Sequence, residues 1–169
     1  MIYFNGFALH GEEQFFKAYL VESDFTVAGF SYGAQKAFEY AYCNSERIDR
    51  LILLSPAFFQ HQKASFVRTQ LRYFKADREV YIQQFLKNVT YPSDTELSAY
   101  VADGSEDELA TLLSYEWDRE KLLELKDRGI TIEVFIGGKD QIVDAAASQA
   151  FFSEITTTYF FKDFGHLLR

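Results

Sequence analysis

A serine lies between two glycines where a predicted strand meets a predicted helix. The stretch 25–42, FTVAGFSYGAQKAFEYAY, passes from a β-branched and aromatic run into GFSYG and then into apolar residues at helical spacing. A G-x-S-x-G segment occurs by chance in about one chain in twenty of this length. A nucleophile elbow requires a strand before the serine, Ser31, a helix after it, and glycines that let the strained turn form without a clash. The alternative interpretation is an ordinary tight turn.

Short apolar runs alternate with helical patterns along most of the chain. The run LILL at 51–54 is uninterrupted, which is typical of a strand covered on both faces. The alternation predicts an α/β fold with a mostly parallel sheet of about five strands and helices on both faces. Strands are predicted at 2–4, 25–28, 51–54, 130–136 and 158–161, and helices at 12–21, 32–42, 121–128 and 145–152.

One long segment interrupts this alternation. The length of 169 residues favours a single domain, 1–169. Residues 57–117 are too long for a bare connection between two strands of a compact domain. We expect them to form a helical insertion that caps one end of the sheet.

Charge is unevenly distributed along the chain. The net charge of −8 argues against nucleic acid as a partner, because phosphates require a cationic surface. Within the predicted insertion, residues 57–89 hold six basic side chains against two acidic ones, whereas residues 90–128 hold eleven acidic against four basic. The acidic and basic side chains are therefore segregated.

Two further residues could act with the serine. Functional groups in open α/β sheets gather at the carboxyl ends of the strands. Asp140 follows the strand ending at Ile136, and His166 follows the last strand. A serine nucleophile needs a general base and an acid that orients it, and the chain order Ser31, Asp140, His166 is the order expected of an α/β-hydrolase.

Other acids and histidines compete for these roles. We expect Asp144 to cap the helix that begins at 145, and Asp163 is too near His166 in sequence to arrive from a separate loop. His10 and His61 do not follow strands, and we expect both to lie on the surface.

An oxyanion hole requires two backbone amides, that of the residue after the nucleophile and one from the loop after the first strand. The first would be the Tyr32 amide. The second comes from FNGFALHGEE, where segments 5–7 and 10–12 both qualify. We prefer Phe7, because residues 10–12 are needed to start the following helix.

The remaining features concern compartment and redox state. The stretch 1–14 has no basic region and its apolar run is broken at Asn5, so we expect neither a signal peptide nor a membrane anchor, and a cytoplasmic protein. Cys43 is the only cysteine, which excludes an internal disulfide, and its apolar neighbours predict a buried thiol.

These segments resemble a known family. NGF after the first strand, GFSYGAQKAFEYAY, LILLSPAF, FVRTQLRYF, IEVFIGGKD and FKDFGHLL are similar to α/β-hydrolase carboxylesterases, and more closely to the short BioV-type pimeloyl-acyl carrier protein methyl ester esterases of biotin synthesis. The resemblance covers nearly the whole chain. Two features depart from the broader hydrolase pattern, since two opening strands are missing and Asn5 stands where a histidine usually precedes the glycine.

The resemblance implies hydrolysis of the methyl ester on pimeloyl-acyl carrier protein, with no cofactor and no metal. It implies Ser31 as nucleophile, His166 as base, Asp140 as orienting acid, and the Phe7 and Tyr32 amides as oxyanion donors. We expect a monomer that binds an acyl carrier protein and neither nucleic acid nor a membrane.

A basic stripe supports a carrier-binding role. Arg68, Arg72 and Lys75 are spaced i, i+4 and i+7, so they share one face if their segment is helical. Acyl carrier proteins are strongly acidic, so this face could dock one; it could equally be an ordinary solvated helix face. The insertion's aromatic residues could cover an acyl chain or form the insertion's own core: Phe58, Phe59, Phe66, Tyr73 and Phe74.

Two other functions fit the same residues. One is a general short-chain carboxylesterase or acyl thioesterase that does not depend on a carrier protein. The other is a noncatalytic binding module on a hydrolase fold. The pattern of residues does not identify a methyl ester; that assignment comes from the resemblance.

Overall fold

The computed structural model describes residues 1–169 and has one sheet of five parallel strands in the order β1-β2-β3-β4-β5. The parallel α/β sheet predicted from the sequence is confirmed. The strands are β1 (Ile2–Phe4), β2 (Thr26–Phe30), β3 (Arg50–Leu54), β4 (Thr131–Gly137) and β5 (Thr157–Phe161).

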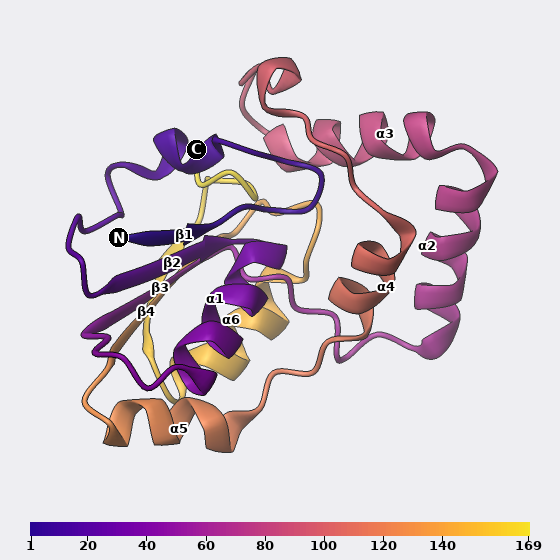
Figure 1. Ribbon diagram of the computed structural model, residues 1–169. Coiled ribbons are helices and arrows are strands. Elements are labelled where there is room, and N and C mark those ends of the chain that lie inside the picture. The colour runs from indigo at the N-terminus through magenta and orange to yellow at the C-terminus, as the bar shows by residue number, and fades with distance from the viewer.

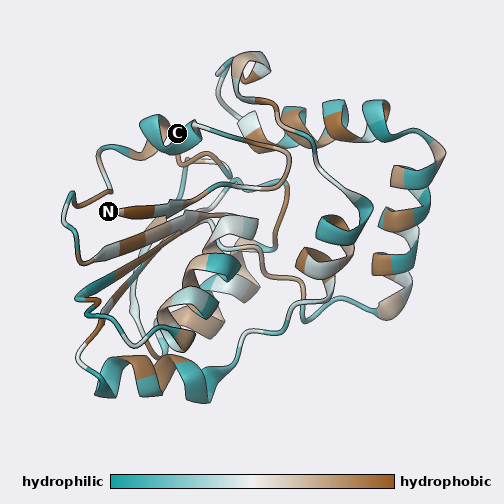
Figure 2. Ribbon diagram, viewed as in Figure 1, coloured by the Kyte–Doolittle hydropathy of each residue, from teal (hydrophilic) through white to brown (hydrophobic).

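Helices cover one face of the sheet, as Figure 1 shows: α1 (Tyr32–Cys43), α5 (Arg119–Asp127) and α6 (Ala145–Ser153). Their apolar sides pack on Val27, Leu51 and Val134, which alternate along the central strands with residues that point to the opposite face. In Figure 2 the strands are largely hydrophobic, while the helices alternate hydrophobic and hydrophilic residues. Burial of both sheet faces explains the uninterrupted apolar strands.

The opposite face is covered by shorter segments. The 3₁₀ helix η1 (Glu12–Phe16) and the C-terminal Leu167 and Leu168 pack there. The helix predicted at 12–21 is therefore wrong in type and length. The amides of Tyr19 and Leu20 both donate to the Phe16 carbonyl, at 2.8 and 3.1 Å, so the chain turns instead of continuing a helix.

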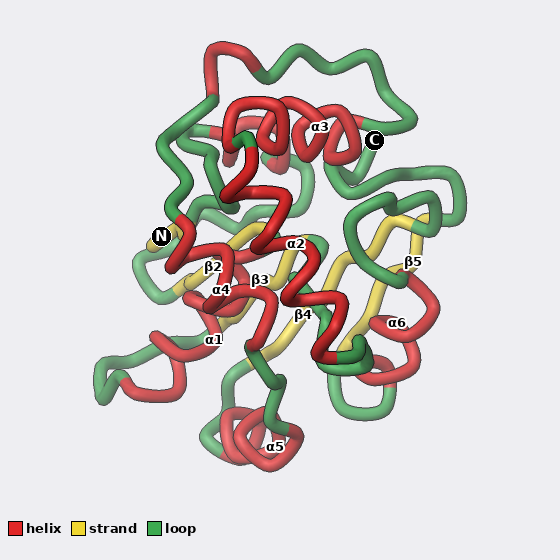
Figure 3. Tube along the Cα trace, turned by 90° about the vertical axis from the view of Figure 1, so that its right-hand side faces the viewer, coloured by secondary structure: helices red, strands yellow, loops and turns green.

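Residues 57–117, called the cap from here on, contain α2 (Ala64–Ala76), α3 (Arg78–Thr90), η2 (Ser98–Tyr100) and α4 (Glu106–Ser114). Figure 1 places these helices beyond the carboxyl ends of the strands, and the view from that side in Figure 3 has α2 and α4 in front of the sheet. The cap therefore lies over the edge at which the predicted functional residues are found.

Both ends of the cap are tied to one carbonyl group. The Ala57 oxygen accepts hydrogen bonds from Gln35 Nε2 at 3.0 Å and from Trp117 Nε1 at 2.8 Å. Gln35 also donates to the Leu112 carbonyl at 3.0 Å. A buried side chain of α1 thus fixes the first residue of the cap and the end of α4 together, because buried amide groups need such partners.

The buried thiol predicted for Cys43 is wrong. Cys43 is the last residue of α1 and is exposed. The last buried residue of α1 is Ala41, and the helical position two residues further on points to the opposite side, so Cys43 faces solvent.

The start of α1 lies against the end of β1 at backbone contact distance. A Cβ atom on Gly33 would lie 1.9 Å from the Phe4 carbonyl oxygen, and one on Gly29 would lie 2.1 Å from the Gly33 carbonyl oxygen. Real Cβ atoms do not approach other atoms so closely, so only glycine fits at either position. These two glycines set the distance between the helix and both strands.

We expect Gly33→Ala to lower the free energy of unfolding by about 3 kcal/mol or more, because backbone and not a flexible side chain must move to admit the methyl group. Gly129→Ala is the matched control. Gly129 has a φ of +85° but open space around its Cβ position. Gly129→Ala should therefore lower the free energy of unfolding only by the cost of a left-handed backbone conformation, about 1–2 kcal/mol. Urea denaturation followed by circular dichroism measures both; equal losses would contradict the packing argument.

Candidate active site

Ser31 occupies a strained turn between β2 and α1. Its φ and ψ are 54° and −113°, which few non-glycine residues adopt, and its side chain is almost fully buried. Its amide donates to the Leu54 carbonyl at 2.9 Å, and its carbonyl accepts from the Ala57 amide at 3.1 Å. Bonds to the chain that leaves β3 therefore hold the turn in this conformation.

Asp140 and His166 form a buried pair. His166 Nδ1 donates to Asp140 Oδ2 at 2.5 Å, and both side chains are inaccessible to solvent. Asp140 Oδ1 accepts from the amides of Ile142 and Val143 at 2.7 and 3.0 Å. Since both of its oxygens accept hydrogen bonds from fixed partners, the carboxylate holds the imidazole in one orientation with the proton on Nδ1.

The other imidazole nitrogen has no partner. His166 Nε2 is buried and makes no hydrogen bond. The imidazole packs on the ring of Phe30, the residue before Ser31, with ring centroids 5.0 Å apart. The Ser55 hydroxyl donates to the His166 carbonyl at 2.6 Å, which fixes the backbone below the ring. The structure thus gathers Ser31, Asp140 and His166 at the carboxyl ends of β2, β4 and β5.

The residues that carry the two predicted oxyanion donors, Phe7 and Tyr32, also lie at this edge. Tyr32 is the first residue of α1, so its amide has no acceptor within the helix. The Phe7 amide donates to no backbone carbonyl among the loops and turns. Gly33, next to Tyr32, packs on the carbonyls of Phe4 and Asn5, which lead into the loop that carries Phe7.

The competing acids and histidines have other environments. Asp144 caps α6 by accepting from the Ala147 amide at 3.0 Å, and this prediction is confirmed. Asp163 pairs with Lys139 at 3.0 Å instead of approaching the imidazole. His10 and His61 are exposed, as predicted.

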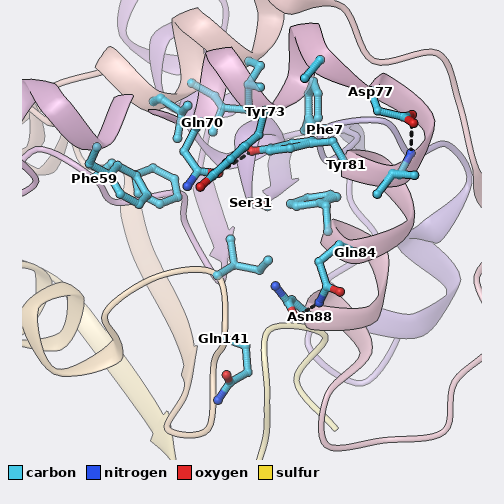
Figure 4. Close-up of a pocket in the computed structure, with 18 residues that line it drawn as sticks. Phe7, Ser31, Phe59, Gln70, Tyr73, Asp77, Tyr81, Gln84, Asn88 and Gln141 are labelled. Carbon is cyan, nitrogen blue, oxygen red and sulfur yellow. Dashed lines mark hydrogen bonds between the residues drawn. The ribbon is translucent and has the colours of Figure 1, made fainter. Parts of the chain in front are cut away.

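A cavity of about 560 Å³ opens above Ser31 (Figure 4). Its volume lies in the range of small-molecule sites. Phe7 forms its base beside Ser31, and α2, α3 and α4 form its walls. The cap aromatics serve both predicted roles: Phe59, Phe66 and Tyr73 line the cavity, and the apolar clusters contain Phe58, Phe74 and also Phe59.

The polar side chains of the cavity are almost all neutral. Figure 4 shows Gln70 and Tyr81 on one wall and Gln84, Asn88 and Gln141 near one another on another. Tyr81 donates to Gln70 Oε1 at 2.9 Å, and burial raises the pKa of Tyr81 to about 12, so its phenol stays neutral. The cavity has no basic lining residue, and its one carboxylate, Asp77, caps α3 through the Val80 amide.

The three residues proposed for docking differ in their surroundings. Arg68 and Arg72 on α2 are exposed and have no carboxylate partner. Lys75 pairs with Glu106 of α4 at 2.9 Å. The acidic and basic segments of the cap thus neutralise each other in part, which linear charge counts could not reveal.

Three supporting residues were missed by the sequence analysis: Glu12, Gln35 and Ser55. Each is a buried polar side chain. A polar residue on the apolar stripe of a helix, as Gln35 is, signals a buried hydrogen bond. Glu12 begins the segment that was taken for an amphipathic helix, where an acidic residue is ordinarily exposed.

No group of three or more His, Cys, Asp or Glu side chains is arranged to bind a metal ion. None of the helices combines the length and the apolar character that crossing a membrane requires.

Comparison with known proteins finds similarity in structure alone. No model of a protein family matches the chain, and no curated protein matches its sequence. Among solved structures, an esterase from Exiguobacterium antarcticum is 20% identical with a TM-score of 0.65 over 83% of this chain and 59% of that one. BioG from Haemophilus influenzae is 10% identical with a TM-score of 0.64 over 98% and 87%. MenH from S. aureus is 16% identical with a TM-score of 0.59 over 98% and 84%.

These similarities establish the α/β-hydrolase fold. The chain spans about three fifths of the length of the esterase, but most of the length of BioG and MenH. The order of the site residues along the chain and their positions at strand ends are those of this fold.

We expect Asp140→Ala to destabilise the protein by about 1–3 kcal/mol more than Asp140→Asn, because asparagine keeps an acceptor for the Ile142 and Val143 amides. Thermal denaturation compares the two variants. In proton NMR spectra, the wild type should show a strongly downfield His166 Nδ1 proton that Asp140→Ala lacks. A downfield signal that persists in Asp140→Ala would contradict the assigned pair.

Proposed function

We propose that this chain is a serine carboxylesterase that hydrolyses the methyl ester of pimeloyl-acyl carrier protein methyl ester. The observation that carries the proposal is the buried Asp140–His166 pair, at 2.5 Å, beside a serine in a strained turn that opens into a neutral cavity. A structural turn needs neither a buried imidazole with a free nitrogen nor a cavity above its serine.

In the first half of the reaction, His166 Nε2 takes the Ser31 hydroxyl proton as Oγ attacks the ester carbonyl carbon. The carbonyl oxygen becomes an oxyanion that accepts hydrogen bonds from the Phe7 and Tyr32 amides. As the intermediate collapses, the bond to the methoxy oxygen breaks. The imidazolium returns its proton, so that methanol leaves and an acyl-enzyme remains.

In the second half, water repeats these steps. His166 takes a proton from a water molecule as the water oxygen attacks the carbonyl carbon of the acyl-enzyme, and the same two amides bind the oxyanion. The proton returns to Ser31 as the ester bond to the enzyme breaks. Asp140 stays ionised and orients the imidazole throughout. The reaction consumes one water and uses no group beyond these side chains and amides.

The cavity suits a neutral acyl ester. Its aromatic and aliphatic walls favour a methylene chain, and its polar groups are amides and a phenol. No basic residue lines it, so nothing in it pairs with a free carboxylate. The methyl ester is neutral whereas its hydrolysed product is an anion, so the cavity favours binding of the substrate over retention of the product.

The outer surface of the cap suits an acidic carrier. Arg68 and Arg72 are exposed on α2, whose other residues Phe66, Gln70 and Tyr73 line the cavity. A carrier bound to this helix would thus be adjacent to the cavity that receives its acyl chain. Lys75 already has an internal partner, so we assign it a smaller part in docking.

A carrier-independent esterase or thioesterase is the alternative function. The pairing of Lys75 with Glu106 favours it, since that pair accounts for part of the basic stripe without a partner protein. Both functions share the chemistry at Ser31 and differ in the use of α2.

The first experiment follows pimeloyl-acyl carrier protein methyl ester by mass spectrometry after incubation with wild type and with Ser31→Ala. Hydrolysis removes one CH₂ from the carrier-bound species, about 14 Da, and we expect this loss with wild type alone. A fluorophosphonate probe should label wild type and not Ser31→Ala, because it reacts with an activated serine.

The outcomes separate the candidate functions. An unchanged carrier mass, together with turnover of p-nitrophenyl butyrate, would leave a carrier-independent esterase and exclude the carrier substrate. Absence of both labelling and turnover would indicate a noncatalytic binding module.

The second experiment replaces Arg68 and Arg72 by glutamate. We expect kcat/KM on the carrier-bound ester to fall about 10- to 100-fold, with less than a twofold change on p-nitrophenyl butyrate, because reversed charges repel the carrier before binding. Lys17→Glu with Lys162→Glu is the matched control, since both lysines are exposed, lie outside the cap, and give the same change in net charge. Equal losses on both substrates, or in both double variants, would contradict docking on α2.

A further inference from the structure

The loop after β1 ends on a buried carboxyl group. Glu12 is fully buried, and its Oε1 accepts a hydrogen bond from the Gly6 amide at 2.7 Å. Its Oε2 has no partner. The one other side chain that donates to Oε1 is that of Tyr3, whose hydroxyl lies 3.5 Å away, and no ion pair involves Glu12. A carboxyl group buried in this way costs stability, so its position calls for a compensating role.

Its hydrogen bond fixes the Asn5–Gly6 peptide, and a second hydrogen bond orients the next peptide, Gly6–Phe7, which shares Gly6 with it. The Gly6 carbonyl accepts from the Leu9 amide at 3.3 Å, while the Gly6 amide is bound by Glu12 on the other side of the residue. A trans peptide points its carbonyl and its N–H in opposite directions. With the Gly6 carbonyl turned toward Leu9, the N–H of the same peptide, which belongs to Phe7, is turned away from Leu9 and has no acceptor in the loop.

This peptide lies beside the serine turn. A Cβ atom on Gly6 would lie 2.9 Å from the ring of Phe30, the residue that precedes Ser31. The Phe7 side chain lines the cavity together with Ser31. A shift of the Gly6–Phe7 peptide would therefore move the Phe7 amide relative to the serine.

The rest of the loop is braced by weaker contacts. Asn5 Oδ1 accepts from the Gly11 amide at 3.2 Å across the same turn, in a partly exposed position. Ala8 has a φ of 55°, which a non-glycine residue adopts only when its surroundings hold it. Glu12 makes the shortest hydrogen bond in this loop and the only fully buried one from a side chain.

We propose that Glu12 is a positioning residue, which aims the Phe7 amide at the oxyanion by holding the Gly6 amide. The inference rests on the serine-esterase function proposed above. It adds that a carboxyl group outside the Ser31, Asp140 and His166 set controls the rate through the backbone, without contact with the substrate.

The test compares Glu12→Gln with Glu12→Leu. Glutamine retains an acceptor for the Gly6 amide, so its kcat on p-nitrophenyl butyrate should stay within about threefold of wild type. Leucine has no acceptor, and kcat should fall about 10- to 100-fold with KM nearly unchanged, because a misplaced donor weakens the transition state more than the bound substrate.

Binding of an alkyl trifluoromethyl ketone distinguishes a positioning role of Glu12 from a role in stability alone, because only the former changes the inhibition constant. This inhibitor forms a hemiketal with the serine, whose oxyanion occupies the position of the transition-state oxygen. Its inhibition constant should rise in Glu12→Leu by the same factor as kcat/KM falls. Leu125→Ala is the control, since Leu125 on α5 is buried in the core on one face of the sheet. This substitution should lower the melting temperature and leave both kcat/KM and the inhibition constant unchanged.

The outcomes are separable. A folded Glu12→Leu with unchanged kcat and inhibition constant overturns the inference while wild-type activity leaves the esterase intact. If Glu12→Leu does not fold, Glu12→Gln decides, and a loss of tenfold or more in the folded glutamine variant overturns the inference. A wild type that neither turns over the ester nor binds the ketone overturns the esterase function and, with it, the role of Glu12.

Discussion

The contact between the start of α1 and the ends of β1 and β2 governs the geometry of the site. Positions 29 and 33 are both glycine. The Phe4 carbonyl oxygen lies 1.9 Å from the place that a Cβ atom on Gly33 would take, and the Gly33 carbonyl oxygen lies 2.1 Å from the place of one on Gly29. This approach brings the loop after β1 close to the turn at Ser31, which has a φ of 54°, and to the Tyr32 amide, which has no helical acceptor because it begins α1.

The other strand ends are fastened to this turn by hydrogen bonds. The Ser31 amide is held by the Leu54 carbonyl at the end of β3, and the Ser55 amide by the Phe135 carbonyl in β4. The Ser55 hydroxyl then holds the His166 carbonyl beyond β5. These bonds join the end of β3 to the turn after β2, to β4 and to the segment after β5, so the positions of Ser31 and His166 are fixed relative to the same strand end. Groups placed on rigid elements in this way keep the precision that acid–base chemistry needs.

The sequence predicted the features that depend on local pattern. The five strands, the turn at Ser31 and the positions of Asp140 and His166 after their strands follow from apolar runs and from glycine placement. The prediction of a helix at 12–21 was wrong because it relied on the helical spacing of the apolar side chains at residues 15–20. In the structure the short helix ends at Phe16 and the chain then turns. The thiol of Cys43 was misjudged for a different reason, since its apolar neighbours suggested burial although its position lies on the opposite side of the helix from Ala41, the last buried residue of α1.

Tertiary partners were beyond the reach of the sequence. Nothing local indicates that Lys75 pairs with Glu106, or that Gln35 joins Ala57 to Leu112, because the partners lie more than 20 residues away. The segregated charges of the cap therefore suggested a larger free basic surface than the structure has. Charge counts along a chain give the composition of a surface only when the segments do not pack on each other.

The cap separates two kinds of recognition. Its inner side offers aromatic rings and neutral amides, and Arg68 and Arg72, two of its cations without a carboxylate partner, are exposed on α2. A cation inside the cavity would stabilise a carboxylate product and slow its release, whereas a cation outside is screened by salt and acts mainly on the rate of encounter. A single amphipathic helix can thus draw an acidic partner to the mouth of the cavity while the cavity itself remains selective for an uncharged ester.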